Sequence, residues 1–132
     1  MPDRDVASVS SKIALIVDDD EVLAEILRHL LEHLGYVVWC AHSASAALEV
    51  WARSSASISF VFTDVMMPGM DGLSLARVLR KDVPTIPILL LSGYINDDSR
   101  WIVSEENFCF LQKPFTLEEL TGAMNMLVGP TG

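Results

Sequence analysis

Short apolar segments alternate along this chain with longer segments in which apolar residues recur every three or four positions. The first such pair is Lys12 to Val17, followed by apolar positions from Val22 to Leu34 that stop at Gly35. An apolar segment without polar alternation is typical of a strand buried on both faces, and the longer spacing is typical of an amphipathic helix. This alternation constrains the fold more than any other feature of the sequence.

The same alternation continues toward the C-terminal end, so we expect five strands and five helices. The expected strands cover 12–17, 36–40, 58–63, 86–91 and 108–111, and the expected helices cover 22–34, 43–53, 72–81, 96–104 and 116–127. Thr116 and Glu119 have the spacing of a capping box at the start of the last helix. The helix over 96–104 is short and rests mainly on cap candidates at its start, Asn96, Asp97 and Asp98.

Strands that are separated by helices need crossover connections, which place helices on both faces of a parallel sheet. The sequence therefore predicts a doubly wound α/β domain with a five-stranded parallel sheet flanked by five helices. The domain is expected over 12–128, with a flexible N-terminal tail at 1–11 and a C-terminal tail at 129–132. A length of 132 residues leaves little room for a second domain.

The charge balance limits the partners of the domain. Eighteen acidic residues against nine basic ones give a net charge of −9, which disfavours direct nucleic-acid binding and attracts divalent cations and basic partners. The longest apolar stretch, Ile86 to Leu91, is far below the ~18 residues of a membrane span, and the acidic start lacks a signal-peptide pattern. We therefore expect no membrane insertion and a cytoplasmic location.

Four acidic residues, Asp18 to Glu21, follow the first strand. Acids at a helix start are stabilised by the helix dipole, and this explanation suffices for Asp20 and Glu21. Asp18 and Asp19 lie one step earlier, at the edge of the strand, where adjacent carboxylates repel unless a cation or a proton holds them together. Taken alone, this pair leaves both a metal site and a helix start open.

Further polar residues follow the other buried strands. Asp64 follows the third, and if the first and third strands are neighbours, three acids can share one divalent cation. Ser92 ends the fourth strand and is by itself equally explained as a turn hydroxyl. Lys113, one of only three lysines, follows the fifth. A carboxylate, a cation, a hydroxyl and an ammonium on one edge suit phosphoryl transfer.

At these positions the chain resembles a known family. The segments Val17-Asp18-Asp19, Asp64 to Gly72, Leu91-Ser92-Gly93 and Lys113-Pro114-Phe115 occur in the order found in the receiver domain of two-component response regulators. The resemblance spans about residues 12–127. It implies the flavodoxin-like (βα)5 fold, and it implies that Asp64 accepts a phosphoryl group from a phosphohistidine on a histidine kinase or a histidine phosphotransfer protein.

The resemblance also implies roles for the residues around Asp64. By carry-over, Asp18, Asp19, Asp64 and the backbone carbonyl of Met66 bind Mg²⁺ (or Mn²⁺). Ser92 and Lys113 contact the phosphoryl oxygens, and the Lys113–Pro114 bond is cis.

Receiver domains also suggest a switch. Ser92 and Phe110 occupy the positions that rearrange in the family, although Phe110 stands where a tyrosine is usual and is equally explained as a core phenylalanine. Met66 and Tyr94 lie where the family sets the lifetime of the phosphoryl group. Both are large and lack an acidic group, which predicts slow self-dephosphorylation. The short helix 96–104 argues against the dimer common among DNA-binding regulators, so we expect a monomer or a weak dimer.

Two other functions compete with a non-enzymatic phosphoacceptor. A Mg²⁺-dependent phosphohydrolase would also use Asp64 as nucleophile, but it generally needs an acid two residues later, where this chain has Met66. A pseudo-receiver binding module that is never phosphorylated would be expected to have lost acids of the cluster or Lys113. The sequence leaves open whether the domain acts alone, passes the phosphoryl on, or is a segment of a hybrid kinase.

Overall fold

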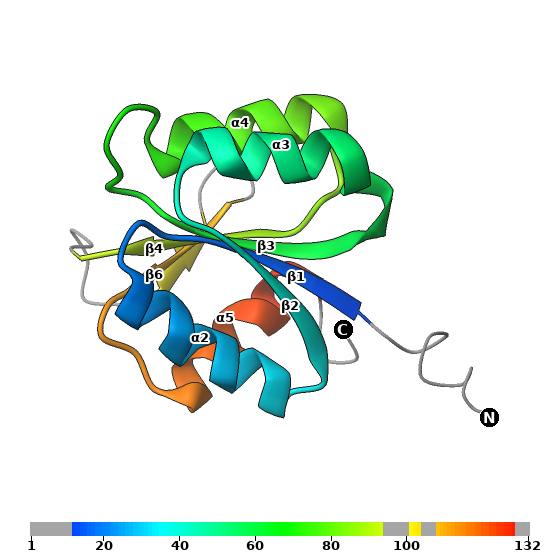
Figure 1. Cartoon of the computed structure of the whole chain (residues 1–132). Coiled ribbons are helices and arrows are strands. Elements are labelled where there is room, and N and C mark those ends of the chain that lie inside the picture. The colour runs from blue at the N-terminus through cyan, green and yellow to red at the C-terminus, as the bar shows by residue number, and fades with distance from the viewer. Residues whose placement is uncertain (1–11, 94–100, 104–107, 129–132) are drawn as a thin grey trace.

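The computed structural model describes residues 12–93, 101–103 and 108–128 (Figure 1). The strands are β1 (Lys12–Val17), β2 (Tyr36–Ala41), β3 (Ile58–Asp64), β4 (Ile88–Ser92), β5 (Trp101–Val103) and β6 (Cys109–Gln112). The helices are α2 (Glu21–His33), α3 (Ala44–Ser54), α4 (Gly72–Asp82) and α5 (Leu117–Val128), with a 3-10 turn η1 (Ser55–Ser57) after α3. Outside 96–104, every predicted strand and helix is confirmed, with ends that differ by at most two residues.

The strands form one sheet in the order β2-β1-β3-β4-β6-β5. The pairs β1–β2, β1–β3, β3–β4 and β4–β6 are all parallel, which confirms the five-stranded parallel sheet of a flavodoxin-like fold. The chain winds outward from β1 in both directions, so the strand order reverses between β1 and β3. Ligands of doubly wound sheets bind beyond the carboxyl ends of the strands at this point.

The predicted helix over 96–104 is wrong at its C-terminal part. Residues 101–103 form β5, a sixth strand that pairs antiparallel with β6, in the register Trp101 with Leu111 and Val103 with Cys109. The three residues Trp-Ile-Val are aromatic or β-branched and adjacent, a composition that favours a strand over a helix. The rest of that predicted helix lies outside the described residues, as do the two predicted tails.

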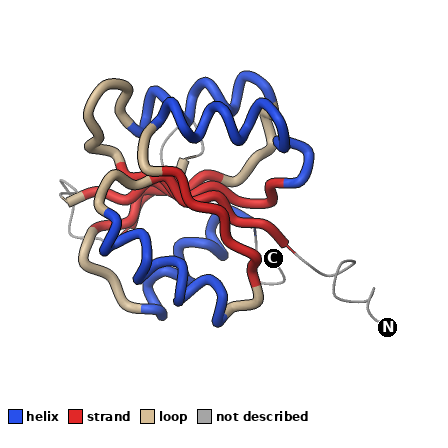
Figure 2. Tube along the Cα trace, in the orientation of Figure 1, coloured by secondary structure: helices blue, strands red, loops and turns tan. Residues whose placement is uncertain are grey.

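Two helical layers enclose the sheet (Figures 1 and 2). Helices α3 and α4 cover one face, where Leu15, Val61 and Leu90 of the sheet are buried. Helices α2 and α5 cover the other face, where Ile16 and Phe62 are buried. Because both faces are covered, the strands carry apolar residues at successive positions rather than alternating ones. In the described part of the chain, no helix is long and apolar enough to cross a membrane.

The helix starts agree with their sequence signals. The carboxylate of Asp20 caps α2 by accepting hydrogen bonds from the N–H groups of Val22 (3.0 Å) and Leu23 (3.2 Å). Thr116 and Glu119 exchange backbone-to-side-chain hydrogen bonds of 3.0 Å at the start of α5, the predicted capping box. Strand β4 begins two residues later than predicted, after Pro87, which has no N–H group for the ladder.

Candidate functional site

The carboxyl ends of the parallel strands bring the predicted polar residues to one edge of the sheet. Asp18 directly follows β1, and Asp64 is the last residue of β3. Ser92 ends β4 in register with Gln112 of β6, and Lys113 comes next. The neighbouring pairs β1–β3, β3–β4 and β4–β6 therefore place these side chains in a row across the switch point.

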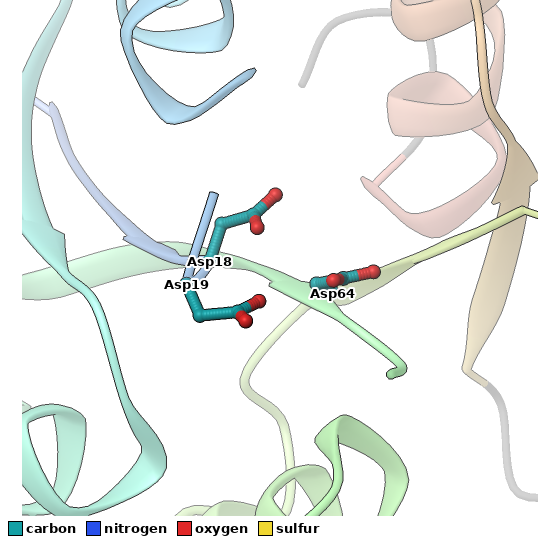
Figure 3. A group of neighbouring side chains, drawn as sticks. All are labelled: Asp18, Asp19 and Asp64. Atoms are coloured by element: carbon teal, nitrogen blue, oxygen red, sulfur yellow. The ribbon is translucent and has the colours of Figure 1, made fainter. Parts of the chain in front are cut away.

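Three carboxylates converge at this edge. Asp18, Asp19 and Asp64 each offer an oxygen within 4.8 Å of the others. Asp18 and Asp19 extend from the end of β1 toward the side on which Asp64 lies (Figure 3). Asp18 and Asp64 are buried, with 1% and 5% of their surface exposed, whereas Asp19 is exposed. We call this cluster of two buried carboxylates and one exposed carboxylate the acidic pocket.

Lys113 supplies the ammonium of this pocket. Its Nζ lies 3.1 Å from Oδ1 of Asp64, and both side chains are largely shielded from water. The Lys113 backbone N–H donates to the carbonyl of Ser92 at 2.7 Å, which fixes the chain beside β4 where the side chain begins. The Lys113–Pro114 bond is cis, as predicted.

The carboxylate of Asp18 is incompletely satisfied. Its Oδ1 accepts a hydrogen bond from the N–H of Asp20 at 2.9 Å, but its buried Oδ2 has no hydrogen-bond partner within the described residues. Burial raises the pKa of the Asp18 carboxyl; the Asp20 N–H opposes this, and the charge of Asp64 adds to it. Because this pKa is higher in the folded chain than in the unfolded one, ionisation of Asp18 lowers the free energy of unfolding as pH rises from the ordinary value toward the raised one. This reduction in the free energy of unfolding remains at neutral pH.

The charges of the pocket fit a divalent cation. Three carboxylates carry three negative charges, Lys113 carries one positive charge, and the remaining two negative charges equal the charge of one divalent ion. Carboxylate oxygens are the ligands that Mg²⁺ and Mn²⁺ prefer, and the unpartnered Oδ2 of Asp18 is a free ligand atom. The residues present thus suit the metal that the sequence predicts.

Gly72 has a structural role at this site that the sequence analysis missed. Its N–H donates to the carbonyl of Val65 at 2.9 Å, which closes the loop after β3 onto its own start. A Cβ at Gly72 would lie 2.0 Å from the carbonyl oxygen of Asp64. The signal was the glycine that ends the Asp64-to-Gly72 segment; only the structure shows that it touches the backbone of Asp64.

We expect Gly72→Ala to lower the free energy of unfolding by about 1–3 kcal/mol, the usual range for forcing an atom into a packed interior. The cause is the clash with the Asp64 carbonyl, which must move for a methyl group to fit. Chemical denaturation measures the change. Gly93→Ala is the matched control, because its Cβ would meet no atom of the described residues within 4 Å. Equal effects of the two variants would contradict this explanation.

The remaining predicted residues lie around the pocket. The side chain of Met66 is 75% exposed, between the backbone anchors Val65 and Gly72. Phe110 of β6 is half-buried and packs against the core under α3 and α4, while Ser92 is half-buried at the end of β4. Tyr94 lies outside the described residues.

His42 is a second residue that sequence analysis missed. It directly follows β2, and its Nδ1 lies 2.9 Å from the backbone carbonyl oxygen of Asp18. Its place after an apolar strand gave a signal that the sequence interpretation did not use.

Comparison with known proteins agrees with this geometry. A family model described as the response regulator receiver domain matches residues 14–125. Sensor kinase CckA of Brucella abortus is 39% identical over 114 residues, which are 86% of this chain and 12% of that protein. Response regulator MprA of Mycobacterium ulcerans is 38% identical over 118 residues, 89% of this chain and 50% of that protein. The structure of response regulator TrrA of Thermotoga maritima in complex with Mg²⁺-BeF is similar, with a TM-score of 0.73 and 28% identity over 88% of this chain and 98% of that one.

Proposed function

The chain belongs to the response regulator receiver domain family, a signalling domain of two-component systems, and on this premise we propose that Asp64 is its phosphoacceptor. The phosphoryl group would come from a phosphohistidine on a histidine kinase or a histidine phosphotransfer protein. The charge balance at the carboxyl edge of the sheet carries the proposal. Three carboxylates and one ammonium carry a net charge of −2, which one divalent cation would neutralise. One of the three carboxylates, that of Asp64, is already paired with Lys113.

In the proposed transfer, a carboxylate oxygen of Asp64 attacks the phosphorus of the phosphohistidine. The bond between phosphorus and the imidazole nitrogen breaks, and that nitrogen keeps the electron pair. With a proton on the other ring nitrogen of the phosphohistidine, the products are an acyl phosphate on Asp64 and a neutral histidine on the donor. Lys113 bonds to Asp64 before transfer, and its ammonium is available to a phosphoryl oxygen afterwards. Ser92 would donate its hydroxyl to another phosphoryl oxygen.

Asp18, Asp19, Asp64 and the backbone carbonyl of Met66 would hold the Mg²⁺. When bound, the ion supplies positive charge to the phosphoryl oxygens during transfer. The similar TrrA structure is a complex with Mg²⁺-BeF, which supports this assignment. The unpartnered Oδ2 of Asp18 gives the same support from this chain itself.

We propose that phosphorylation changes the surface at the end of the sheet formed by β6 and β5. Ser92 would move toward the phosphoryl group, and the ring of Phe110 would repack. Ser92 and Phe110 lie on the adjacent strands β4 and β6. In this chain β5 pairs beside β6, so the partner-binding surface includes an antiparallel strand edge where a helix was expected.

The proposal also covers the phosphoryl donor, the location and the oligomeric state of the domain. The chain spans half of MprA and 12% of CckA, and one of these relatives is a sensor kinase while the other is a response regulator. Both support a histidine kinase as the source of phosphoryl groups. We propose a cytoplasmic location and a monomer or a weak dimer.

Incubation with Mg²⁺ and acetyl phosphate, followed by intact-mass measurement, tests the function. The expected result is a single, stable addition of one phosphoryl group. Rapid consumption of the donor without any accumulated adduct would favour a phosphohydrolase. Absence of both would favour a pseudo-receiver that only binds partners.

We expect slow self-dephosphorylation, because neither Met66 nor Tyr94 carries an acidic group that could position a water molecule. A Met66→Asn, Tyr94→Glu double variant should lose its phosphoryl group about tenfold faster, below the ~10²-fold that a well-placed acid or base contributes. The decay of the phosphorylated protein, followed by intact mass after the donor is removed, gives both rates. A Met66→Leu variant keeps a large apolar side chain and should decay like the wild type. If the double variant decays no faster, these two residues do not set the lifetime.

A further inference from the structure

The side chain of His42, to which the sequence assigned no role, is hydrogen-bonded to the backbone of Asp18 in the acidic pocket. His42 lies 24 positions beyond Asp18 in the sequence, and its Nδ1 is 2.9 Å from the Asp18 carbonyl oxygen. A carbonyl oxygen can only accept, so Nδ1 carries the proton and donates. The bond therefore joins the segment after β2 to the first acid after β1.

With this contact, hydrogen bonds from the segment at the end of β2 hold both the N–H and the C=O of Asp18; we call this pair of bonds the clamp. On one side, the backbone N–H of Asp18 donates to the carbonyl of Ala41 at 3.0 Å. On the other side, the carbonyl of Asp18 accepts from His42. The sheet pairing of β1 with β2 ends at Val17 and Ala41, and the imidazole holds the chain one step farther.

The clamp controls where two carboxylates point. Each peptide unit is planar, so a hydrogen bond to its N–H or its C=O restrains the orientation of the whole unit. The N–H of Asp18 belongs to the unit before its Cα, and the C=O belongs to the unit shared with Asp19. Restraining both units limits the backbone angles of Asp18, and with them the direction in which the Asp18 side chain leaves. It also sets the plane from which Asp19 begins.

We infer that His42 is a positioning residue for the metal site, holding Asp18 and Asp19 in the arrangement that converges with Asp64. The inference rests on the proposed function, because it assumes that these acids bind Mg²⁺. This ion demands nearly ideal octahedral geometry, so its affinity is sensitive to small displacements of the ligands. His42 is exposed and does not belong to either hydrophobic core, so its loss should disturb the pocket more than the fold.

The test measures Mg²⁺ binding without phosphorylation. Isotope-labelled wild-type protein and variants are titrated with MgCl₂, and the shifts of backbone amide signals near residues 18–20 and 64–65 give the dissociation constant. We expect His42→Ala to weaken binding about three- to tenfold, the effect of losing one ordinary hydrogen bond. His42→Asn should restore most of the affinity, because the asparagine amide nitrogen is a donor at the same number of bonds from the backbone.

His29→Ala is the matched control. His29 is exposed on α2 and contacts Glu25 at 3.3 Å, so its removal changes a surface histidine that has no contact with the three aspartates of the site among the described residues. The melting temperature of each variant without metal is measured in parallel. Wild-type affinity in His42→Ala would overturn the inference, and so would equal weakening in His42→Ala and His42→Asn, since a role in positioning predicts rescue. If the wild type itself fails to bind Mg²⁺, the proposed function fails and the inference fails with it.

Discussion

Replacing Asp64 with asparagine is expected to abolish phosphorylation. The variant keeps the size of the side chain but removes the carboxylate that we propose as the nucleophile, and no other acid of the pocket occupies its place at the end of β3. Asp64 is also the acid that Lys113 contacts, so the substitution removes the anionic partner of the Lys113 ammonium as well. Intact mass after incubation with Mg²⁺ and acetyl phosphate should show no adduct.

Asp20→Asn is the control for this variant. Asp20 is a neighbouring exposed acid that caps α2, and asparagine caps helices as well as aspartate does. The control should therefore fold and accept a phosphoryl group as the wild type does. An adduct of normal yield on Asp64→Asn would show that another residue is the acceptor.

Replacing Asp18 with asparagine is expected to stabilise the metal-free protein and to remove its response to Mg²⁺. The Asp18 carboxylate is buried beside Asp64, and its Oδ2 has no partner within the described residues. Asparagine keeps an oxygen for the Asp20 N–H, removes one of the crowded negative charges and presents an amide to the other acids. We expect the free energy of unfolding to rise by about 1–2 kcal/mol in a chelator, within the range for relieving an unsatisfied buried polar group.

The same denaturation experiment with MgCl₂ completes the test. Mg²⁺ should stabilise the wild type, because a ligand that binds only the folded state shifts the unfolding equilibrium. The Asp18→Asn variant should gain little, and Asp20→Asn should respond as the wild type does. A variant that is less stable than the wild type without metal would show that the Asp18 charge is compensated by the protein alone.

Most of the fold could be predicted because its signals are local. The apolar segment Lys12–Val17 and the spacing of apolar residues through Glu21–His33 each indicate their own structure, and alternation of such segments leaves few topologies. The prediction for the segment before β6 failed because Asn96 to Asp98 resemble a helix cap while Trp101–Val103 favour a strand. Which tendency wins depends on pairing with β6, a contact that the sequence does not show.

The site was predictable where residues follow strands directly. Asp18, Asp64 and Lys113 could be placed on one edge because parallel strands end on the same side of a sheet. His42 and Gly72 were missed because their contacts depend on distances between segments. A histidine after a strand and a glycine in a loop have many ordinary uses, and only the 2.9 Å bond of His42 and the close approach of Gly72 to Asp64 distinguish them.

Mapping the phosphorylated residue is the most direct test of the central claim, that the acids and Lys113 form one site in which a divalent ion prepares Asp64 for phosphoryl transfer. The protein is incubated with acetyl phosphate with and without Mg²⁺, digested, and the modified peptide is identified by mass spectrometry. The account predicts that the phosphoryl group is found on Asp64 and that its yield collapses when Mg²⁺ is chelated. A phosphoryl group on a different residue, or an equal yield on Asp64 without any divalent ion, would contradict it.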